Sequence, residues 1–85
     1  MEKLGAIRVR VVYDENLKKI TKKDFDEPVV SENLSFPMFL NFIFTSYPKI
    51  TKEYPPGKLG FLLNNSIPQD FDILEDGDEI KIIGV

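Results

Sequence analysis

The alternation of apolar and polar residues near the start of the sequence indicates a strand. Residues 4–13 read LGAIRVRVVY. Successive side chains of a strand point to opposite faces, so one row of this segment faces a core and the other is exposed. The polar run Asp14-Glu15-Asn16 follows and is typical of a turn. We therefore expect a half-buried strand followed by a hairpin. The row expected to face the core is Ile7, Val9 and Val11, and the alternate row is Arg8, Arg10 and Val12.

Residues 17–30 carry a mixed signal. Leu17 and Ile20 stand three apart, as on a short helix, whereas Val29 and Val30 favour extended chain, and Pro28 disfavours helix. We expect an irregular edge strand, because lysines suit an edge that must not pair with other molecules. A short helix, and a site for acidic partners at the lysines, remain open alternatives. The four lysines are Lys18, Lys19, Lys22 and Lys23.

One amphipathic helix is predicted over residues 36–47. Ser35 is a suitable N-cap, and Pro37 falls in the first turn, where a missing N–H is tolerated. Pro48 ends the helix, because the residue before a proline is displaced from the helical region. At about 100° per residue, one broad apolar face is predicted. It consists of Phe36, Phe39, Leu40, Ile43, Phe44 and Tyr47.

Met38 and Phe42 lie off this face, four residues apart on one flank of the predicted helix. Residues 49–58 (KITKEYPPGK) contain a Pro-Pro pair, which excludes a helix or a central strand there, so we expect a loop. This loop is long enough to fold over Met38 and Phe42. The alternative is that both side chains form an apolar contact for a partner.

The last third of the sequence alternates short apolar runs with turn signals. A short strand is predicted over residues 60–64, a tight turn at residues 64–66, and a final strand over residues 79–85 after the turn signal Asp76-Gly77. The apolar members of residues 70–74 are expected to fill the bottom of the core. These are Phe71, Ile73 and Leu74.

Together these elements predict an α+β fold. One helix with a broad aromatic face must bury it on one face of a sheet. A right-handed crossover through that helix places the final strand parallel to and beside the first. The expected architecture is a β-grasp: a mixed four- to five-stranded sheet packed on one main helix. With 85 residues, one domain over residues 1–85 is expected.

Composition narrows the possible functions. The sequence contains no cysteine and no histidine, which removes the thiolate nucleophile and the commonest general base. Its 11 basic and 14 acidic residues, net charge −3, argue against a nucleic-acid-binding face. The acidic run at residues 70–79 lacks the ligand spacing of a calcium loop. No apolar run approaches membrane-spanning length, and residues 1–5 contain no leader-like apolar run. We expect a cytoplasmic protein that is not an enzyme and uses no metal or cofactor.

Four segments resemble the small ubiquitin-like sulfur carriers, namely the small subunit of molybdopterin synthase and the thiamin-biosynthesis sulfur carrier. They span nearly the whole chain, and the last is the most specific, because that family commonly has a leucine and an acidic residue before Gly-Asp-Glu and the final strand. The segments are IRVRVVY (residues 7–13), TSYPKI (45–50), FLLNNSI (61–67) and LEDGDEIKII (74–83).

The resemblance implies chemistry at a C-terminal Gly-Gly, whose carboxylate is adenylated and converted to a thiocarboxylate. This sequence reads Ile82-Ile83-Gly84-Val85 at that place, with a single glycine and a β-branched last residue. We therefore expect a non-catalytic ubiquitin-like interaction module or an accessory subunit related to the sulfur carriers. A sulfur carrier or protein modifier activated at Gly84 and Val85 is the alternative.

The expected binding site is the open face of the sheet. If Ile80 and Ile82 face the helix, the alternate residues of the final strand point away from it. Parallel pairing with the first strand then brings an apolar centre and a basic rim together. This is similar to the apolar patch with a basic rim that ubiquitin-like folds present to partners, so the predicted partner is another protein. The apolar centre is Val12, Ile83 and Val85, and the rim is Arg8, Arg10 and Lys81.

Overall fold

The structure is a computed structural model that describes residues 5–55 and 57–85. Residues 1–4 lie outside the described residues. The first residue of the first predicted strand, Leu4, is among them, as are most of residues 1–5, in which no leader-like apolar run was found. Pro56, one half of the Pro-Pro pair, also lies outside the described residues. In chain order the elements are β1 (Ala6–Arg8), β2 (Arg10–Tyr13), α1 (Glu15–Thr21), β3 (Phe25–Asp26), β4 (Val29–Ser31), α2 (Phe36–Ser46), α3 (Pro48–Glu53), β5 (Leu59–Leu63) and β6 (Glu79–Gly84).

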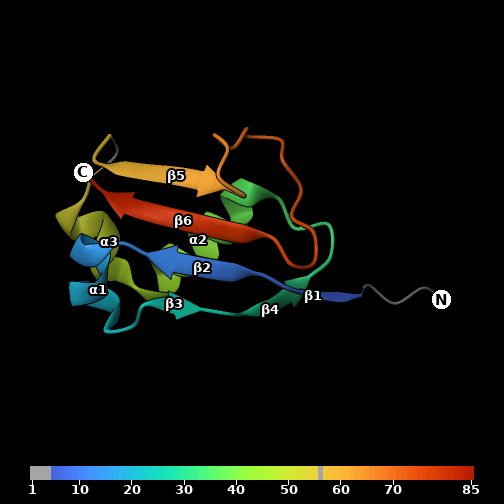
Figure 1. Cartoon of the computed structure of the whole chain (residues 1–85), viewed down its shortest axis with the longest axis horizontal. Coiled ribbons are helices and arrows are strands. Elements are labelled where there is room, and N and C mark those ends of the chain that lie inside the picture. The colour runs from blue at the N-terminus through green and yellow to red at the C-terminus, as the bar shows by residue number, and fades with distance from the viewer. Residues whose placement is uncertain (1–4, 56) are drawn as a thin grey trace.

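A four-stranded sheet in the order β3-β2-β6-β5 forms the body of the molecule (Figure 1). β2 and β6 are parallel, with Val11 beside Ile80, and the other neighbours are antiparallel. β1 and β4 form a separate antiparallel pair that extends the sheet. Between this pair and the β2–β3 pair, the N–H of Val9 donates to the Pro28 carbonyl at 3.1 Å. The predicted parallel contact of the final strand with the first is confirmed.

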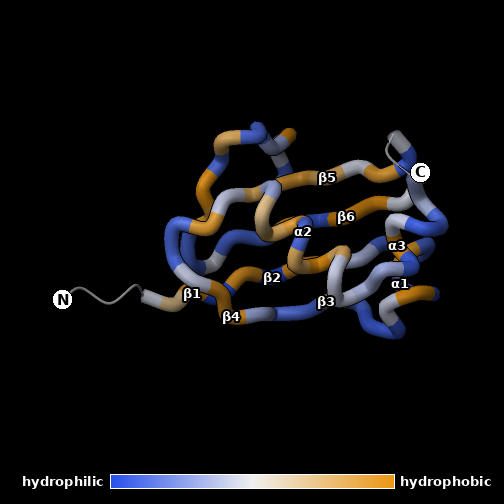
Figure 2. The backbone as a smooth tube through the Cα atoms, turned by 180° about the vertical axis from the view of Figure 1, so that it is seen from behind, coloured by the Kyte–Doolittle hydropathy of each residue, from blue (hydrophilic) through white to orange (hydrophobic). Residues whose placement is uncertain are grey.

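The helix α2 crosses one face of this sheet (Figure 2). The hydroxyl of Ser35 accepts a hydrogen bond from the Met38 N–H at 3.4 Å, so the predicted N-cap is confirmed, and Tyr47 is the C-cap. Fully burying a large apolar side chain contributes about 1.5–3 kcal/mol, so this core supplies the main stabilisation. The buried apolar residues are Ile7, Val9, Val11, Tyr13, Leu17, Phe36, Phe39, Ile43, Ile50, Leu74, Ile80 and Ile82.

The hairpin turn expected after β2 is wrong, because the helix α1 takes its place. The Asp14 carboxylate accepts a hydrogen bond from the Leu17 N–H at 2.9 Å, which caps the helix, and Leu17 is fully buried. The edge strand expected over residues 17–30 is correct only in its second half, where β3 pairs with β2 and β4 with β1. Local capping and the burial of one leucine therefore outweighed the extended-chain signal.

The loop expected over residues 49–58 is wrong in its first part. Pro48, which ends α2, is the first residue of α3, a position where proline is favoured. Ile50 of α3 is fully buried, so the burial of one side chain fixes the short helix. The chain therefore does not fold over the flank of α2, and Met38 and Phe42 remain 63% and 45% exposed.

The connection from β5 to β6 follows the predicted turns but not the predicted packing. Asn64 and Asn65 have φ of 50° and 67°, as a tight hairpin turn requires, and Gly77 has φ of 87°. Leu74 is buried as expected. Phe71 and Ile73 are 76% and 50% exposed, so the prediction that they fill the core is wrong. The Phe36 N–H donates to the Asp72 carbonyl at 2.9 Å, which ties this connection to the start of α2 through the backbone.

Candidate functional site

The outer face of the sheet, which α2 does not cover, carries a row of side chains across all four strands. Val12 of β2 stands in register with Phe25 of β3 on one side and with Lys81 of β6 on the other. Lys81 is in turn beside Leu62 of β5. Ile83 lies two residues further along β6, on the same face. We call these five residues the open-face row; they place three aliphatic side chains, one aromatic ring and one cation on adjacent strands.

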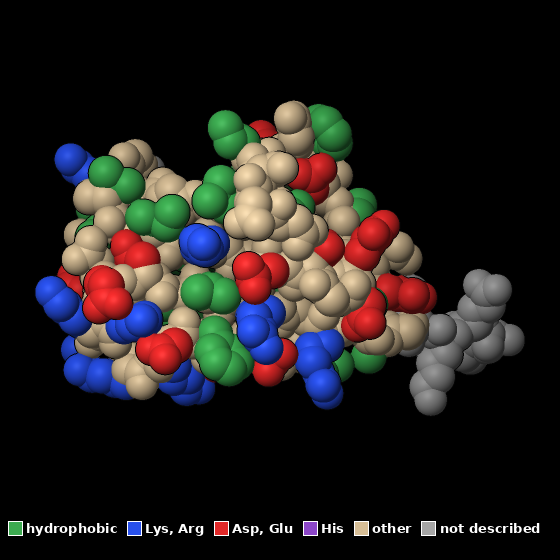
Figure 3. Space-filling view, viewed as in Figure 1, with side chains coloured by type: hydrophobic (Ala, Val, Ile, Leu, Met, Phe, Trp, Pro, Cys, Tyr) green, Lys and Arg blue, Asp and Glu red, His purple; other side chains and the backbone are tan. Residues whose placement is uncertain are grey.

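Charged groups surround the open-face row. The Arg10 guanidinium lies 4.7 Å from the centre of the Phe25 ring, and its Nη2 donates to Glu27 Oε2 at 3.2 Å. Lys81 makes no ion pair among residues 5–55 and 57–85. Apolar and cationic side chains lie together over the middle of this face (Figure 3). Such a mixture of aliphatic, aromatic and arginine side chains is typical of protein–protein contact surfaces.

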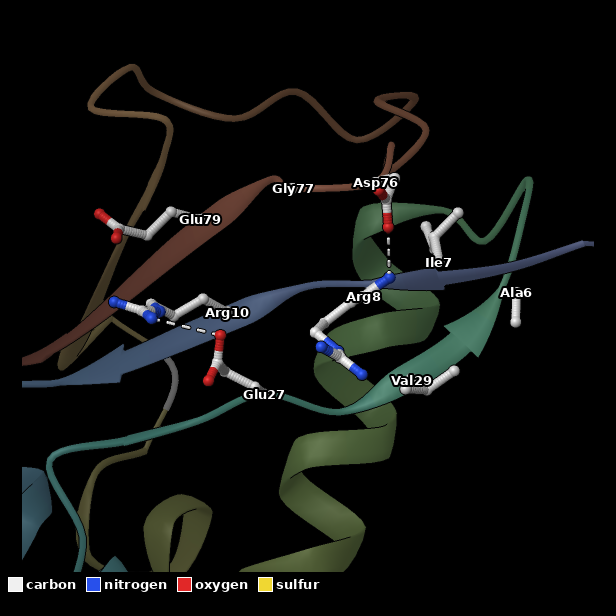
Figure 4. A pocket seen from close by; sticks show the side chains of 9 residues that line it. All are labelled: Ala6, Ile7, Arg8, Arg10, Glu27, Val29, Asp76, Gly77 and Glu79. Atoms are coloured by element: carbon white, nitrogen blue, oxygen red, sulfur yellow. Dashed lines mark hydrogen bonds and ion pairs between the residues drawn. The ribbon is translucent and has the colours of Figure 1, made fainter.

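A hollow of about 580 Å³ adjoins the row at the β1 end of the sheet (Figure 4). Arg8 and Arg10 line it together with Glu27, Asp76 and Glu79. The Arg8 N–H donates to Asp76 Oδ1 at 2.8 Å, which fixes the turn before β6 against β1. With two cations and three carboxylates, the hollow has no surplus of positive charge.

The end of β6 is held on both sides by hydrogen bonds. The Gly84 N–H donates to Asp14 Oδ2 at 3.0 Å, and Asn16 Nδ2 donates to the Gly84 carbonyl at 2.9 Å. Gly84 is buried, and a Cβ at this position would lie 2.9 Å from Cε1 of Tyr54. Val85 is 76% exposed, and its N–H donates to the Lys58 carbonyl at 2.8 Å. Gly84 therefore has a packing role in this fold, because the Tyr54 ring occupies the space that a side chain would need.

A hydrogen-bonded cluster on the other side of the sheet joins β2, β3 and α2. Asp26 Oδ2 accepts from the hydroxyls of Tyr13 at 2.7 Å and Tyr47 at 2.8 Å, and Asp26 Oδ1 accepts from Lys23 Nζ at 2.9 Å. Burial raises the pKa of Asp26, but these three hydrogen bonds outweigh it and hold the pKa below its usual value. Burial and the hydrogen bond to Asp26 raise the pKa of Tyr13 far above its usual range. The same two causes raise the pKa of Tyr47 by a smaller amount. This cluster fixes the edge strand to the helix.

The structure brings together four of the six residues predicted for the open face: Arg10, Val12, Lys81 and Ile83. Arg8 lies outside the four-stranded sheet on β1, and Val85 lies beyond the end of β6. Sequence reasoning missed Phe25 and Leu62. Leu62 follows the inward-facing Phe61 in the predicted strand, so the two-residue alternation of a strand could have placed Leu62 on the open face. Phe25 could not be placed without the register between β2 and β3.

The second predicted contact, Met38 and Phe42, lies on the flank of α2. Phe42 lines a hollow of about 260 Å³ with Pro28, Ser46 and Tyr47, and its ring centroid is 6.1 Å from that of Phe39. No acidic cluster with a metal-binding arrangement occurs within the described residues. In the same part of the chain, no helix is long and apolar enough to cross a membrane.

Comparison with known proteins identifies the fold. No protein-family model matches the sequence, and no curated protein matches it in sequence. Solved structures match it over nearly their whole length, as follows. A protein described as molybdopterin converting factor subunit 1 of Pyrococcus furiosus is 17% identical, with a TM-score of 0.83 over 92% of this chain and 97% of that one. The small archaeal modifier protein 1 of Haloferax volcanii is 11% identical, with a TM-score of 0.79 over 92% and 97%. The ubiquitin of Caldiarchaeum subterraneum is 15% identical, with a TM-score of 0.64 over 95% of each chain.

These matches confirm the predicted architecture and agree with the resemblance found in the sequence. The chain has the ubiquitin-like β-grasp fold.

Proposed function

We propose that this chain is a non-catalytic ubiquitin-like module that binds another protein through the open-face row. The observation that carries the proposal is the position of Phe25, Val12, Lys81 and Leu62 in one continuous row on the uncovered side of the sheet. A binding surface of this kind needs an apolar centre that excludes water and a polar rim that sets orientation. The four apolar members of the row supply the centre, and Arg10 and Lys81 supply the cations.

The test is an Ile83→Asp substitution in the tagged chain, used to isolate partners from cells. A carboxylate at this half-buried position disrupts the apolar centre without entering the core, so we expect the fold to persist and the partners to be lost. The matched control is Ile67→Asp, because Ile67 is 81% exposed in a loop outside the row. The proposal fails if the same partners are recovered with Ile83→Asp as with the unchanged chain.

Met38 and Phe42 are a second contact in this proposal. The solvent-exposed flank of α2 leaves both side chains accessible, and Phe42 borders a hollow. A Phe42→Ser substitution separates this contact from the first. Loss of a subset of partners, with the remainder kept, supports two surfaces; an unchanged set of partners limits binding to the sheet face.

A sulfur carrier or protein modifier that is activated at its C-terminus is the second candidate function. It is supported by the fold shared with two proteins, one described as a molybdopterin converting factor subunit and the other as a small archaeal modifier protein. Against it, Gly84 is buried and hydrogen-bonded to Asn16 and Asp14, so the end of β6 would have to detach before the Val85 carboxylate could enter an activating site. Intact-mass analysis after incubation with ATP and an activating enzyme is decisive. A gain of sulfur for oxygen at Val85 favours the carrier over the interaction module.

A further inference from the structure

A third hollow, of about 500 Å³, is lined by residues of α1 and α3. These two short helices lie next to each other at one end of the sheet (Figure 1). Lys19 and Lys22 border the hollow from α1, Lys49 borders it from α3, and Ile20 and Tyr54 contribute apolar surface. We call these five residues the lysine hollow. Two segments about thirty residues apart in sequence thus place three ammonium groups around one concave surface, although the whole chain has a net charge of −3.

Ion pairing divides the lysine run of this region into two sets. Lys18 Nζ lies 3.3 Å from both Glu15 and Asp24, and Lys23 Nζ lies 2.9 Å from Asp26. The other two lysines of the run, Lys19 and Lys22, make no ion pair within residues 5–55 and 57–85, nor does Lys49. Glu53 also lines the hollow and offsets one positive charge. A surplus of positive charge remains there.

Lys22 is placed in the hollow at a conformational cost. It is the C-cap of α1, with φ of 63° and ψ of 21°, in the left-handed region where glycine or asparagine is favoured. Its N–H donates to the Lys18 carbonyl at 2.9 Å, a bond that glycine would make equally well. The Lys22 side chain therefore adds a charge to the hollow, and only the Lys22 backbone contributes to the cap.

We propose that the lysine hollow binds an acidic segment of a partner protein, one with several carboxylates and an apolar side chain among them. Charge complementarity selects the carboxylates, and Ile20 with the Tyr54 ring receives the apolar side chain. A single phosphate fits less well. Lysines spread over two helices instead match charges spread along a chain.

The hollow is a surface separate from the open-face row, and the inference goes beyond the function proposed above. It adjoins the end of β6, because Asn16, at its border, donates to the Gly84 carbonyl and Tyr54 packs against Gly84. An acidic segment bound there would contact Asn16 and Tyr54, the side chains that contact Gly84. Two partners, or two parts of one partner, can therefore bind this small domain at once.

The test is an NMR titration of the ¹⁵N-labelled chain with a short peptide of glutamates interspersed with leucine. We expect amide shifts to concentrate around residues 19–22 and 49–54, and binding to weaken as salt is raised. Each of Lys19→Gln, Lys22→Gln and Lys49→Gln should weaken binding about two- to fivefold, the range expected for one exposed charge pair. Lys81→Gln, which removes the same charge on the sheet face, should leave peptide binding unchanged.

Lys22→Gly separates a binding role from a structural one. Glycine relieves the left-handed strain, so the melting temperature should be unchanged or higher, while peptide binding weakens as in Lys22→Gln. Ile83→Asp should bind the peptide normally, so failure of the open-face proposal is distinguishable from failure of this one. Equal binding of a glutamine peptide overturns the inference. So do shifts spread over all lysines, or displacement of the peptide by inorganic phosphate at equal concentration.

Discussion

The parallel strands β2 and β6 present two faces that are built from alternate residues of the same segments. On the inner face Val11, Ile80 and Ile82 have no exposed surface. On the outer face Val12, Lys81 and Ile83 are only half-buried. Inner side chains are constrained by close packing against α2, whereas outer side chains can change without disturbing the core. The inner face therefore determines the fold, and the outer face can carry the proposed binding surface.

Polar groups differ between the two faces in the same way. The inner-face carboxylate of Asp26 accepts three hydrogen bonds, and no buried side-chain nitrogen or oxygen lacks a partner in the described part of the chain. On the outer face Arg10 is half-exposed, with 46% of its side chain accessible. Buried polar groups must be satisfied for the domain to fold, whereas exposed ones contribute little to stability. Substitutions on the two faces should consequently separate stability from binding.

The largest effect is expected from Ile82→Ala on the inner face. Removing this fully buried side chain loses transfer free energy and leaves a cavity, so the free energy of unfolding should fall by about 2–5 kcal/mol. Ile83→Ala, one residue further on the outer face, should lower it by about 1 kcal/mol or less. Urea denaturation of both variants measures the difference. Equal losses would show that the outer face is part of the core and contradict the comparison.

Gly84 tests an inner position that has no side chain. In Gly84→Ala the new Cβ would meet the Tyr54 ring at 2.9 Å, and overpacking of this kind should lower the free energy of unfolding by about 1–3 kcal/mol. Gly60→Ala is the control, because its Cβ meets only the Cβ of Ile83 at 3.9 Å. Chemical denaturation of both variants provides the measurement. If Tyr54→Leu removes the penalty of Gly84→Ala in the double variant, the Tyr54 contact is its cause.

Asp26 makes the inner face sensitive to acid. Its pKa is lower in the folded protein than in the unfolded chain, so the stabilisation is complete above the unfolded value, about 3.9, and is lost as pH falls through the folded value. Asp26→Asn should lower the free energy of unfolding by about 1–2 kcal/mol at neutral pH and flatten its acid dependence. Denaturation curves from about pH 6 down to below pH 3.9 measure both. An unchanged slope would assign the acid dependence to other carboxylates.

The inner face was largely predictable from the sequence because its signal is periodic. Alternation placed Val11 of β2 and Ile80 and Ile82 of β6 in the core, and the 3.6-residue period placed the buried residues of α2. The short helix α1 was predicted only as an alternative to an edge strand, and α3 was missed. Each is held by a local cap or by one buried residue, Leu17 or Ile50, which is too few for a period to show. A site for acidic partners at the lysines of residues 18–23 was predicted as an alternative, but the contribution of Lys49 was not foreseen, because it requires α1 and α3 to lie side by side.

The outer face was predicted only in part, for a different reason. Residues of β2 and β6 were placed correctly because the parallel pairing follows from the crossover rule. Phe25 lies on a two-residue strand, which is too short for a period to show, and it faces outward because it pairs with Val12 of β2. Arg8 was expected on the open-face rim, yet its strand pairs with β4 outside the main sheet. Ion pairs such as that between Arg10 and Glu27 depend on which strands lie side by side, so the composition of the chain does not predict them.

The smallest effect is expected from the contact between Arg10 and Phe25 on the outer face. An exposed cation–π pair contributes about 0.5–1 kcal/mol, and the 4.7 Å distance from the guanidinium to the ring centre suits one. Arg10→Gln and Phe25→Leu should each lower the free energy of unfolding by roughly this amount, and the double variant by less than the sum. A thermodynamic cycle by urea denaturation isolates the coupling. Because Arg10 also pairs with Glu27, the cycle is repeated in Glu27→Gln, where a persistent coupling assigns it to the ring. A coupling that vanishes there would mean that the ion pair holds Arg10 in place and that the outer face adds stability only through exposed charges.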